Sequence, residues 1–161
     1  MEKRFIVDGM LGSLARKLRL YGFDTIYDTS IHDHDMIKIA YSQNRVLLTA
    51  DRELFGRAVK KNIDSILVMG ANDAERLACI FTALAIRADK IDPERSRCPA
   101  CNGTLALTDK PSVSKKLPSR IIERHQEFYA CSNCGKLYWK GSHWRRIESL
   151  AKEVRERLEQ T

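Results

Sequence analysis

The chain has 161 residues, the length of one domain or of one domain with a small addition. Its hydrophobic content of 43% is ordinary for a globular protein, and no apolar run approaches the roughly 20 residues that a membrane-spanning helix needs. The polar first ten residues lack the pattern of a secretion signal. We therefore expect a soluble, cytoplasmic protein that makes no membrane contact.

Positive charge is concentrated in the last third of the chain. The net charge is +7 and the pI is near 9.3. Residues 1–96 hold 15 Lys and Arg against 14 Asp and Glu, whereas residues 97–161 hold 13 against 7. Such a basic surface favours a polyanionic partner, nucleic acid above all. A solvated basic face that only maintains solubility is the alternative.

Residues 1–90 alternate between short apolar strands and helical patterns. Strands are predicted at residues 4–7, 25–27, 45–49 and 65–69, and helices at 10–21, 33–43, 51–61 and 72–88. We expect Met10 and Tyr41 among the inward-facing helical residues, and Gly22 at the end of the first helix. This order predicts an α/β fold with a parallel sheet covered by helices on both faces, in which ligands bind at the carboxyl ends of the strands.

A polar, proline-containing stretch at residues 89–97 predicts a boundary between two domains, residues 1–92 and residues 93–161. Within the second domain, the stretch at residues 102–130 is rich in Pro, Ser and Lys near Lys110–Ser119, which predicts a loop or a flexible β-ribbon. Apolar residues at helical spacing from Trp144 to Leu158 predict a terminal amphipathic helix.

Four of the five cysteines form two Cys-x-x-Cys pairs, which are Cys98 with Cys101 and Cys131 with Cys134, separated by 29 residues. An odd number of cysteines argues against a disulfide framework. A redox site needs only one such pair, whereas two pairs supply the four thiolates of a tetrahedral zinc site. We predict a structural zinc ion, because four thiolates leave no coordination position open.

Basic and aromatic residues interleave around the second cysteine pair. The candidate contacts to RNA in this region are Lys136, Lys140, His143, Arg145 and Arg146. Neighbouring aromatic side chains such as Trp139 can stack on unpaired bases. The alternative is that these aromatic residues pack the zinc ribbon and the helix behind it.

Aspartates stand where the predicted strands end. Asp8 follows the first strand, Asp51 follows the third, and Asp33 and Asp35 open a helix. Carboxylates that converge at one sheet edge repel one another, and Mg²⁺ or Mn²⁺ relieves that repulsion and can activate water against a phosphate. Helix capping is the alternative role for Asp33, Asp35 and Asp73.

Four segments occur in a distinctive order over nearly the whole chain: FIVDGMLGSLARKLR at residues 5–19, YGFDT at 21–25, LLTADREL at 47–54 and CSNCGKLYWKGSHW at 131–144. Together they resemble the Mut-seven C-terminal RNase family, a branch of the PIN-like nucleases. The resemblance implies a PIN-like α/β domain followed by a zinc ribbon that assists RNA binding. It also implies a metal-dependent endoribonuclease that hydrolyses RNA phosphodiester bonds.

The resemblance also implies roles for particular residues. Asp8, Asp33 and Asp51 would be the catalytic acids that hold Mg²⁺ or Mn²⁺, with Asp35 and Asp73 as candidate further acids. RNA backbone contacts would come from Arg16, Lys17, Arg19 and Arg52. The family usually carries arginine where this chain has Ala50, a departure for which Arg52 is the nearest substitute.

The expected partner is RNA, with tRNA, rRNA and the ribosome as candidates. The competing hypothesis is a non-catalytic RNA- or ribosome-binding zinc-ribbon protein, in which the aspartates only cap helices. A weaker third hypothesis is the toxin of a toxin–antitoxin pair.

Overall fold

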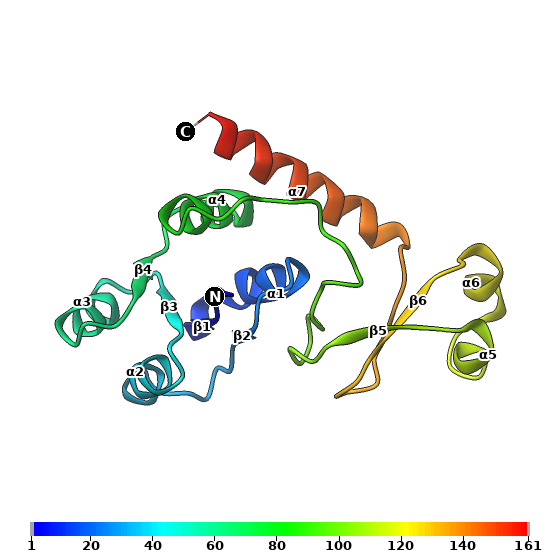
Figure 1. Ribbon diagram of the computed structural model, residues 1–161, viewed down its shortest axis with the longest axis horizontal. Helices are drawn as coiled ribbons and strands as arrows, with labels where there is room; N and C mark the ends of the chain where they lie inside the picture. The colour runs from blue at the N-terminus through cyan, green and yellow to red at the C-terminus, as the bar shows by residue number, and fades with distance from the viewer. Residues whose placement is uncertain (1, 161) are drawn as a thin grey trace.

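The first part of the chain folds around a four-stranded parallel sheet. We describe residues 2–160 from a computed structural model (Figure 1). The strands β1 (Phe5–Val7), β2 (Thr25–Ile26), β3 (Val46–Thr49) and β4 (Ser65–Leu67) lie in the order β2-β1-β3-β4. Val7 lies opposite Leu48, and Thr49 lies opposite Leu67. The parallel α/β fold predicted from the sequence is confirmed.

Helices cover both faces of this sheet. A 3₁₀ turn, η1 (Gly9–Leu11), leads into α1 (Gly12–Leu20), which lies with α4 (Asp73–Ala83) on one face, while α2 (Asp33–Ser42) and α3 (Arg52–Lys60) cover the other. Side chains alternate between the faces, so Phe5 and Val7 join the core under α1 and α4, and Ile6 joins the core under α2 and α3. Burial on both faces explains why the strands read as unbroken apolar runs.

Three details differ from the sequence-based expectations. Helix α4 ends at Ala83 rather than near residue 88, because Ala85 takes a left-handed backbone (φ 52°) and the Ile86 N–H donates to the Phe81 carbonyl at 2.8 Å. Met10 is 82% exposed because it lies in the 3₁₀ turn, where the helical period does not apply. Tyr41 is 78% exposed, at the edge of the apolar stripe of α2.

The second part contains a three-stranded antiparallel sheet in the order β5 (Leu105–Thr108), β6 (Phe128–Cys131) and β7 (Leu137–Tyr138). Two short helices, α5 (Lys110–Val113) and α6 (Ser119–Arg124), occupy the segment between β5 and β6. The expectation of a loop or β-ribbon between the cysteine pairs is met in part, because β5 and β6 pair as an antiparallel ribbon and residues 114–118 are a loop, but the two short helices were not expected. Asp109 caps α5 by accepting the Ser112 N–H at 2.9 Å, and buried Val113 anchors that helix.

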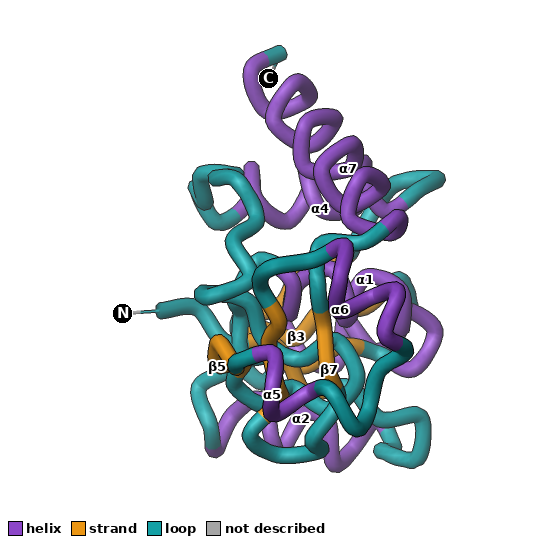
Figure 2. The backbone as a smooth tube through the Cα atoms, turned by 90° about the vertical axis from the view of Figure 1, so that its right-hand side faces the viewer, coloured by secondary structure: helices purple, strands orange, loops and turns teal. Residues whose placement is uncertain are grey.

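The last helix, α7 (Ser142–Glu159), packs along α4 and spans from the ribbon to the first part of the chain (Figures 1 and 2). Val154 is fully buried in the same core as Leu77 of α4, and Arg157 lies 3.5 Å from Glu75. The helix that follows the ribbon in sequence therefore completes the core of the α/β unit. Within residues 2–160, no helix has the length and apolarity needed to cross a membrane.

Candidate functional site

Asp8 and Asp51 are joined through one buried threonine at the carboxyl edge of the sheet. The Thr49 hydroxyl donates to Asp8 Oδ2 at 2.8 Å and accepts the Asp51 backbone N–H at 2.9 Å. This follows from the parallel register, because β1 and β3 are neighbours and end side by side. Thr49 is fully buried, so its hydroxyl is committed to these two contacts.

Each of these two carboxylates keeps one oxygen uncommitted. Asp51 Oδ1 accepts the N–H groups of Glu53 and Leu54 at 2.7 and 3.2 Å, which caps α3. Among the described residues, Asp51 Oδ2 and Asp8 Oδ1 accept no hydrogen bond. Asp51 therefore caps a helix, as one hypothesis held, and still presents an oxygen at the sheet edge.

The other acids have partners of their own. Asp33, at the start of α2, forms an ion pair with Arg57 of α3. Asp35 lies 3.9 Å from Lys38 on the exposed side of α2. Asp73, at the start of α4, accepts the Ser13 hydroxyl of α1 at 2.5 Å. Within residues 2–160, no three carboxylates lie close enough together to form a group that could hold a metal ion, so the structure does not gather Asp8, Asp33 and Asp51 into one.

Sequence reasoning missed three residues of this edge: Thr49, Ser13 and Arg57. Thr49 carries the one usable signal, because it is the only hydroxyl in the apolar run of β3 and stands two residues before Asp51. Ser13 and Arg57 lie on helices far in sequence from the acids that they contact, so only the tertiary fold reveals them.

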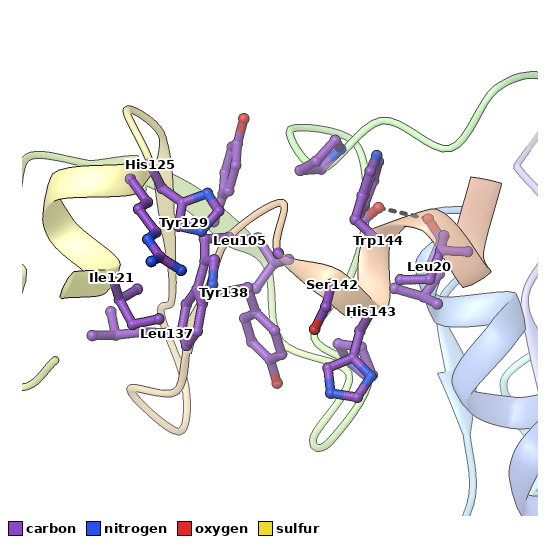
Figure 3. Close-up of a pocket in the computed structure, with 17 residues that line it drawn as sticks. Leu20, Leu105, Ile121, His125, Tyr129, Leu137, Tyr138, Ser142, His143 and Trp144 are labelled. Carbon is purple, nitrogen blue, oxygen red and sulfur yellow. Dashed lines mark hydrogen bonds between the residues drawn. The ribbon is translucent and has the colours of Figure 1, made fainter. Parts of the chain in front are cut away.

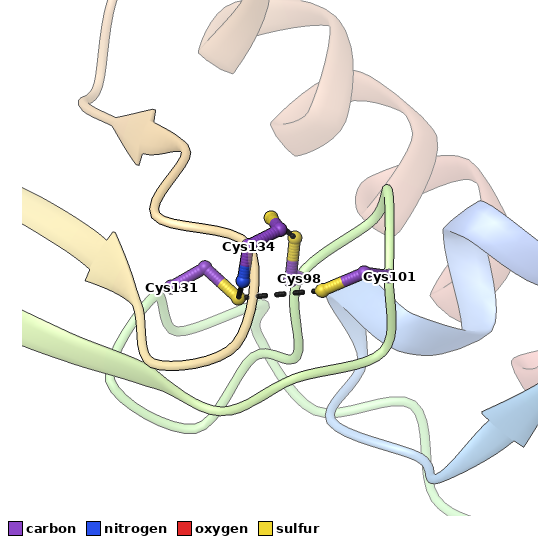
Figure 4. Close-up of side chains that lie close together, drawn as sticks. All are labelled: Cys98, Cys101, Cys131 and Cys134. Atoms are coloured by element: carbon purple, nitrogen blue, oxygen red, sulfur yellow. Dashed lines mark hydrogen bonds between the residues drawn. The ribbon is translucent and has the colours of Figure 1, made fainter.

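The four paired cysteines converge on one point (Figure 4). Their sulfur atoms all lie within 4.8 Å of one another, with 3.7 Å between Cys98 and Cys134 and 3.4 Å between Cys101 and Cys131. Four sulfurs bound to zinc at about 2.3 Å in a tetrahedron lie about 3.8 Å apart. The cluster can hold a metal ion, and with the three-stranded sheet it has the architecture of a zinc ribbon.

Local backbone structure shapes this cluster. The N–H groups of Asn133 and Cys134 point at Cys131 Sγ from 3.4 and 3.5 Å, so the second knuckle stabilises a thiolate. Gly103 is required in the first knuckle, because a Cβ there would lie 2.7 Å from Cys131 Sγ. Hydrogen bonds from the side chain of Asn133 and the backbone of Gly103 lower the pKa of Cys101 to about 6, which favours the thiolate at this one position.

Buried polar contacts dock the cysteine cluster onto the α/β unit. Arg19, at the end of α1, is 5% exposed and donates to the carbonyls of Thr25, Pro99 and Ala100 at 3.0, 2.9 and 3.3 Å. The cluster therefore sits at the end of α1 that is remote from Asp8. The expectation that Arg19 contacts RNA is corrected, because its guanidinium is enclosed by these carbonyls.

A second set of contacts centres on Asp24. Arg45 binds both oxygens of Asp24, at 2.9 and 3.0 Å, and Asn102 of the first knuckle donates to it at 2.8 Å. Burial alone would raise the pKa of Asp24, but the hydrogen bonds from Arg45 and Asn102 prevail and lower it. The charged carboxylate of Asp24 thus links Arg45, which precedes β3, to Asn102 beside the first cysteine pair.

The remaining basic candidates lie in two groups. Arg16 and Arg52 are exposed and Lys17 is half-buried on the α/β unit, whereas the exposed residues of the second group, Lys136, Lys140, His143, Arg145 and Arg146, surround the ribbon and the start of α7. A cavity of about 510 Å³ opens beside this second group (Figure 3). Its walls come from the ribbon, α6, the start of α7 and Leu20 of α1.

The comparisons with known proteins gave one match. The family model of the Mut7-C RNAse domain matches residues 3–151, which include the acidic edge, all four paired cysteines and the first half of α7. Searches of the curated proteins and of the solved structures found no match.

Proposed function

Because the chain belongs to the Mut7-C RNAse domain family, we propose that it is a metal-dependent endoribonuclease that hydrolyses RNA phosphodiester bonds. The single observation that carries the proposal is the contact network Asp8–Thr49–Asp51 at the carboxyl edge of the parallel sheet. In this proposal, residues 1–92 form a PIN-like nuclease domain and residues 93–161 form the RNA-binding module, whose terminal helix α7 also packs into the core of the nuclease domain.

The acidic edge suits a hard divalent cation. Carboxylate oxygens are the ligands that Mg²⁺ and Mn²⁺ prefer, and Asp8 and Asp51 each retain one oxygen for this purpose. The proposal takes Asp33 as the third acid, which would have to exchange its ion pair with Arg57 for the metal, and keeps Asp35 and Asp73 as candidate further acids. When bound, the metal would lower the pKa of the attacking water and stabilise charge on the phosphate.

The chain's own residues would position the substrate at this edge. Thr49 fixes the carboxylate of Asp8, and Ser13 fixes Asp73 between α1 and α4. Arg52 begins α3 immediately after Asp51 and is exposed, so it can contact an RNA phosphate beside the acids. Arg16 and Lys17 on α1 would extend this contact along the RNA backbone.

The cysteine cluster would hold a structural zinc ion. Its four sulfurs fill a tetrahedral shell, which leaves no place for a catalytic water. The Tyr138 hydroxyl lies 3.0 Å from Cys98 Sγ, and burial together with this contact raises the pKa of Tyr138 well above its ordinary range. The tyrosine therefore keeps its proton and can donate to the thiolate, as residues around a metal site commonly do.

The alternative function is a non-catalytic RNA- or ribosome-binding protein. Two observations favour it: Asp51 caps α3, and Asp33 is paired with Arg57. Both hypotheses predict RNA binding, but only the nuclease hypothesis predicts cleavage that depends on Asp8.

The test is cleavage of end-labelled RNA with Mn²⁺ or Mg²⁺ by the wild type, Asp8→Asn and Asp64→Asn. Asp64 is an exposed aspartate just before β4, at the opposite edge of the sheet, and serves as the matched control. We expect Asp8→Asn to lose at least about 100-fold in rate while still binding RNA, because even indirect partners of a metal contribute 10- to 100-fold. Equal cleavage by the two variants would refute the proposed site. If the wild type and both variants bind RNA and none of them cleaves it, the non-catalytic binding protein is favoured.

A further inference from the structure

The cavity of about 510 Å³ is walled mainly by aromatic and aliphatic side chains (Figure 3). Its lining includes Tyr129, Tyr138, Trp139, Trp144, Ile121 and His125. Trp139 lies beside Phe128, with ring centroids 6.4 Å apart, and the Trp144 indole N–H donates to Glu148 at 2.7 Å. The two indole rings are therefore anchored, although both remain half-exposed.

We propose that this cavity binds an unpaired nucleobase of the RNA, which deepens the proposed function because it takes RNA as the ligand. The volume falls within the roughly 300–1,000 Å³ of small-ligand pockets. Each of the four bases has a flat aromatic face that can stack on tryptophan and tyrosine, so such stacking does not depend on the RNA sequence. Ser142 and His125 add groups that can form hydrogen bonds with the edge of a base.

The charges at the cavity match a nucleotide rather than an apolar peptide. Arg124 lines the cavity and is exposed, and exposed Lys140, Arg145 and Arg146 stand beside its lining residues in the chain. The Lys140 ammonium lies 5.3 Å from the centre of the Trp144 ring. An apolar cavity bordered by cations offers one place for the base and another for its phosphate.

The cysteine cluster and the cavity have residues in common. Tyr138 lines the cavity and also contacts Cys98, and Leu105, another lining residue, pairs with Cys131 across the ribbon. The rings that would stack on a base are thus held by the same strands that carry the thiolates.

The cavity lies away from the acidic edge. Leu20 at the end of α1 lines it, whereas Asp8 precedes the 3₁₀ turn η1 that leads into the other end of that helix. Nine helical residues extend about 13 Å, which is about four nucleotides at the ~3.4 Å rise of a stacked strand. A base held here would anchor the RNA several nucleotides from the cut.

The chain's two tryptophans, Trp139 and Trp144, both line the cavity, so tryptophan fluorescence, excited at a wavelength that tyrosine does not absorb, reports on this site. The zinc-loaded full chain, without Mg²⁺ or Mn²⁺, is titrated with single-stranded RNA hexamers and with a base-free ribose–phosphate hexamer of equal charge. We expect quenching and tighter binding only with the base-bearing RNA. Equal quenching by both hexamers, or none by either, would overturn the proposal.

A matched pair of variants tests the stacking directly. Trp144→Leu and Trp144→Phe lose the same bond to Glu148, but only phenylalanine keeps an aromatic face. We expect the leucine variant to bind RNA about 5- to 100-fold more weakly than the phenylalanine variant, and equal affinities would contradict the proposal. Circular dichroism and zinc content establish that both are folded.

The experiments distinguish a failure of the base-pocket proposal from a failure of the nuclease proposal. Mn²⁺-dependent cleavage without base-specific quenching overturns the pocket and leaves the nuclease proposal standing. Base-specific quenching without cleavage supports the pocket and counts against the nuclease.

Discussion

Replacing Arg19 with methionine tests how the metal module is attached to the α/β unit. Methionine keeps the aliphatic bulk of arginine but removes the donors to three carbonyls. Thr25 is fully buried, so its unpaired carbonyl costs about 1–3 kcal/mol, while the more accessible carbonyls of Pro99 and Ala100 can be hydrated and cost about 0.5 kcal/mol each. We expect a loss of about 2–4 kcal/mol, a large part of the ~5–15 kcal/mol of a typical domain.

The assay is urea unfolding at a fixed zinc concentration, followed by circular dichroism and by tryptophan fluorescence. The control is Arg16→Met, which removes an exposed arginine one turn earlier in the same helix and should change stability by less than about 0.5 kcal/mol. Zinc transfer to a chromogenic chelator should be faster for Arg19→Met, because Pro99 and Ala100 lie between Cys98 and Cys101 of the cysteine cluster. The reasoning is refuted if the two variants are equally stable.

Three further predictions concern single contacts. Gly103→Ala should weaken zinc binding at least about 10-fold in a competition titration, because the added Cβ would lie 2.7 Å from Cys131 Sγ. The control, Gly56→Ala, places its Cβ in open space on α3 and should instead stabilise the protein by about 0.5–1 kcal/mol. Thr49→Val should lower cleavage about 10- to 100-fold and raise the Mn²⁺ concentration needed, and an unchanged metal requirement would show that Thr49 does not position the acids. Because the pKa of Asp24 is lowered by folding, its carboxylate stabilises the fold above the unfolded pKa of about 3.9, and this contribution is lost as the pH falls toward the folded pKa. The difference in free energy of unfolding between wild type and Asp24→Asn should therefore shrink from pH 7 to pH 3 in urea titrations. A difference that stays constant would contradict the lowered pKa.

Residues that act through local structure were predictable from the sequence. The strands and helices of residues 1–90 and the terminal helix follow from apolar periodicity, and Gly22, with φ 93°, ends α1 as expected. The two Cys-x-x-Cys pairs predicted the cysteine cluster, because each pair lies in one short turn built from adjacent residues. The parallel order of strands followed from their alternation with helices.

Residues that act through distant partners were not predictable in the same way. Arg19 looks like any exposed basic residue on α1 until Pro99 and Ala100 close over it. The pairing of Asp33 with Arg57 depends on how α2 and α3 pack, which no local pattern encodes.

The sequence by itself determined the fold class, the cysteine cluster and the acids at the strand ends, because these depend on short-range periodicity and spacing. Only the tertiary structure decided that Thr49 joins Asp8 to Asp51, that α7 completes the core beside α4, and that an aromatic cavity opens beside the ribbon. The physical reason is that these features arise where side chains from distant segments meet, and such meetings depend on packing and burial rather than on the order of residues along the chain.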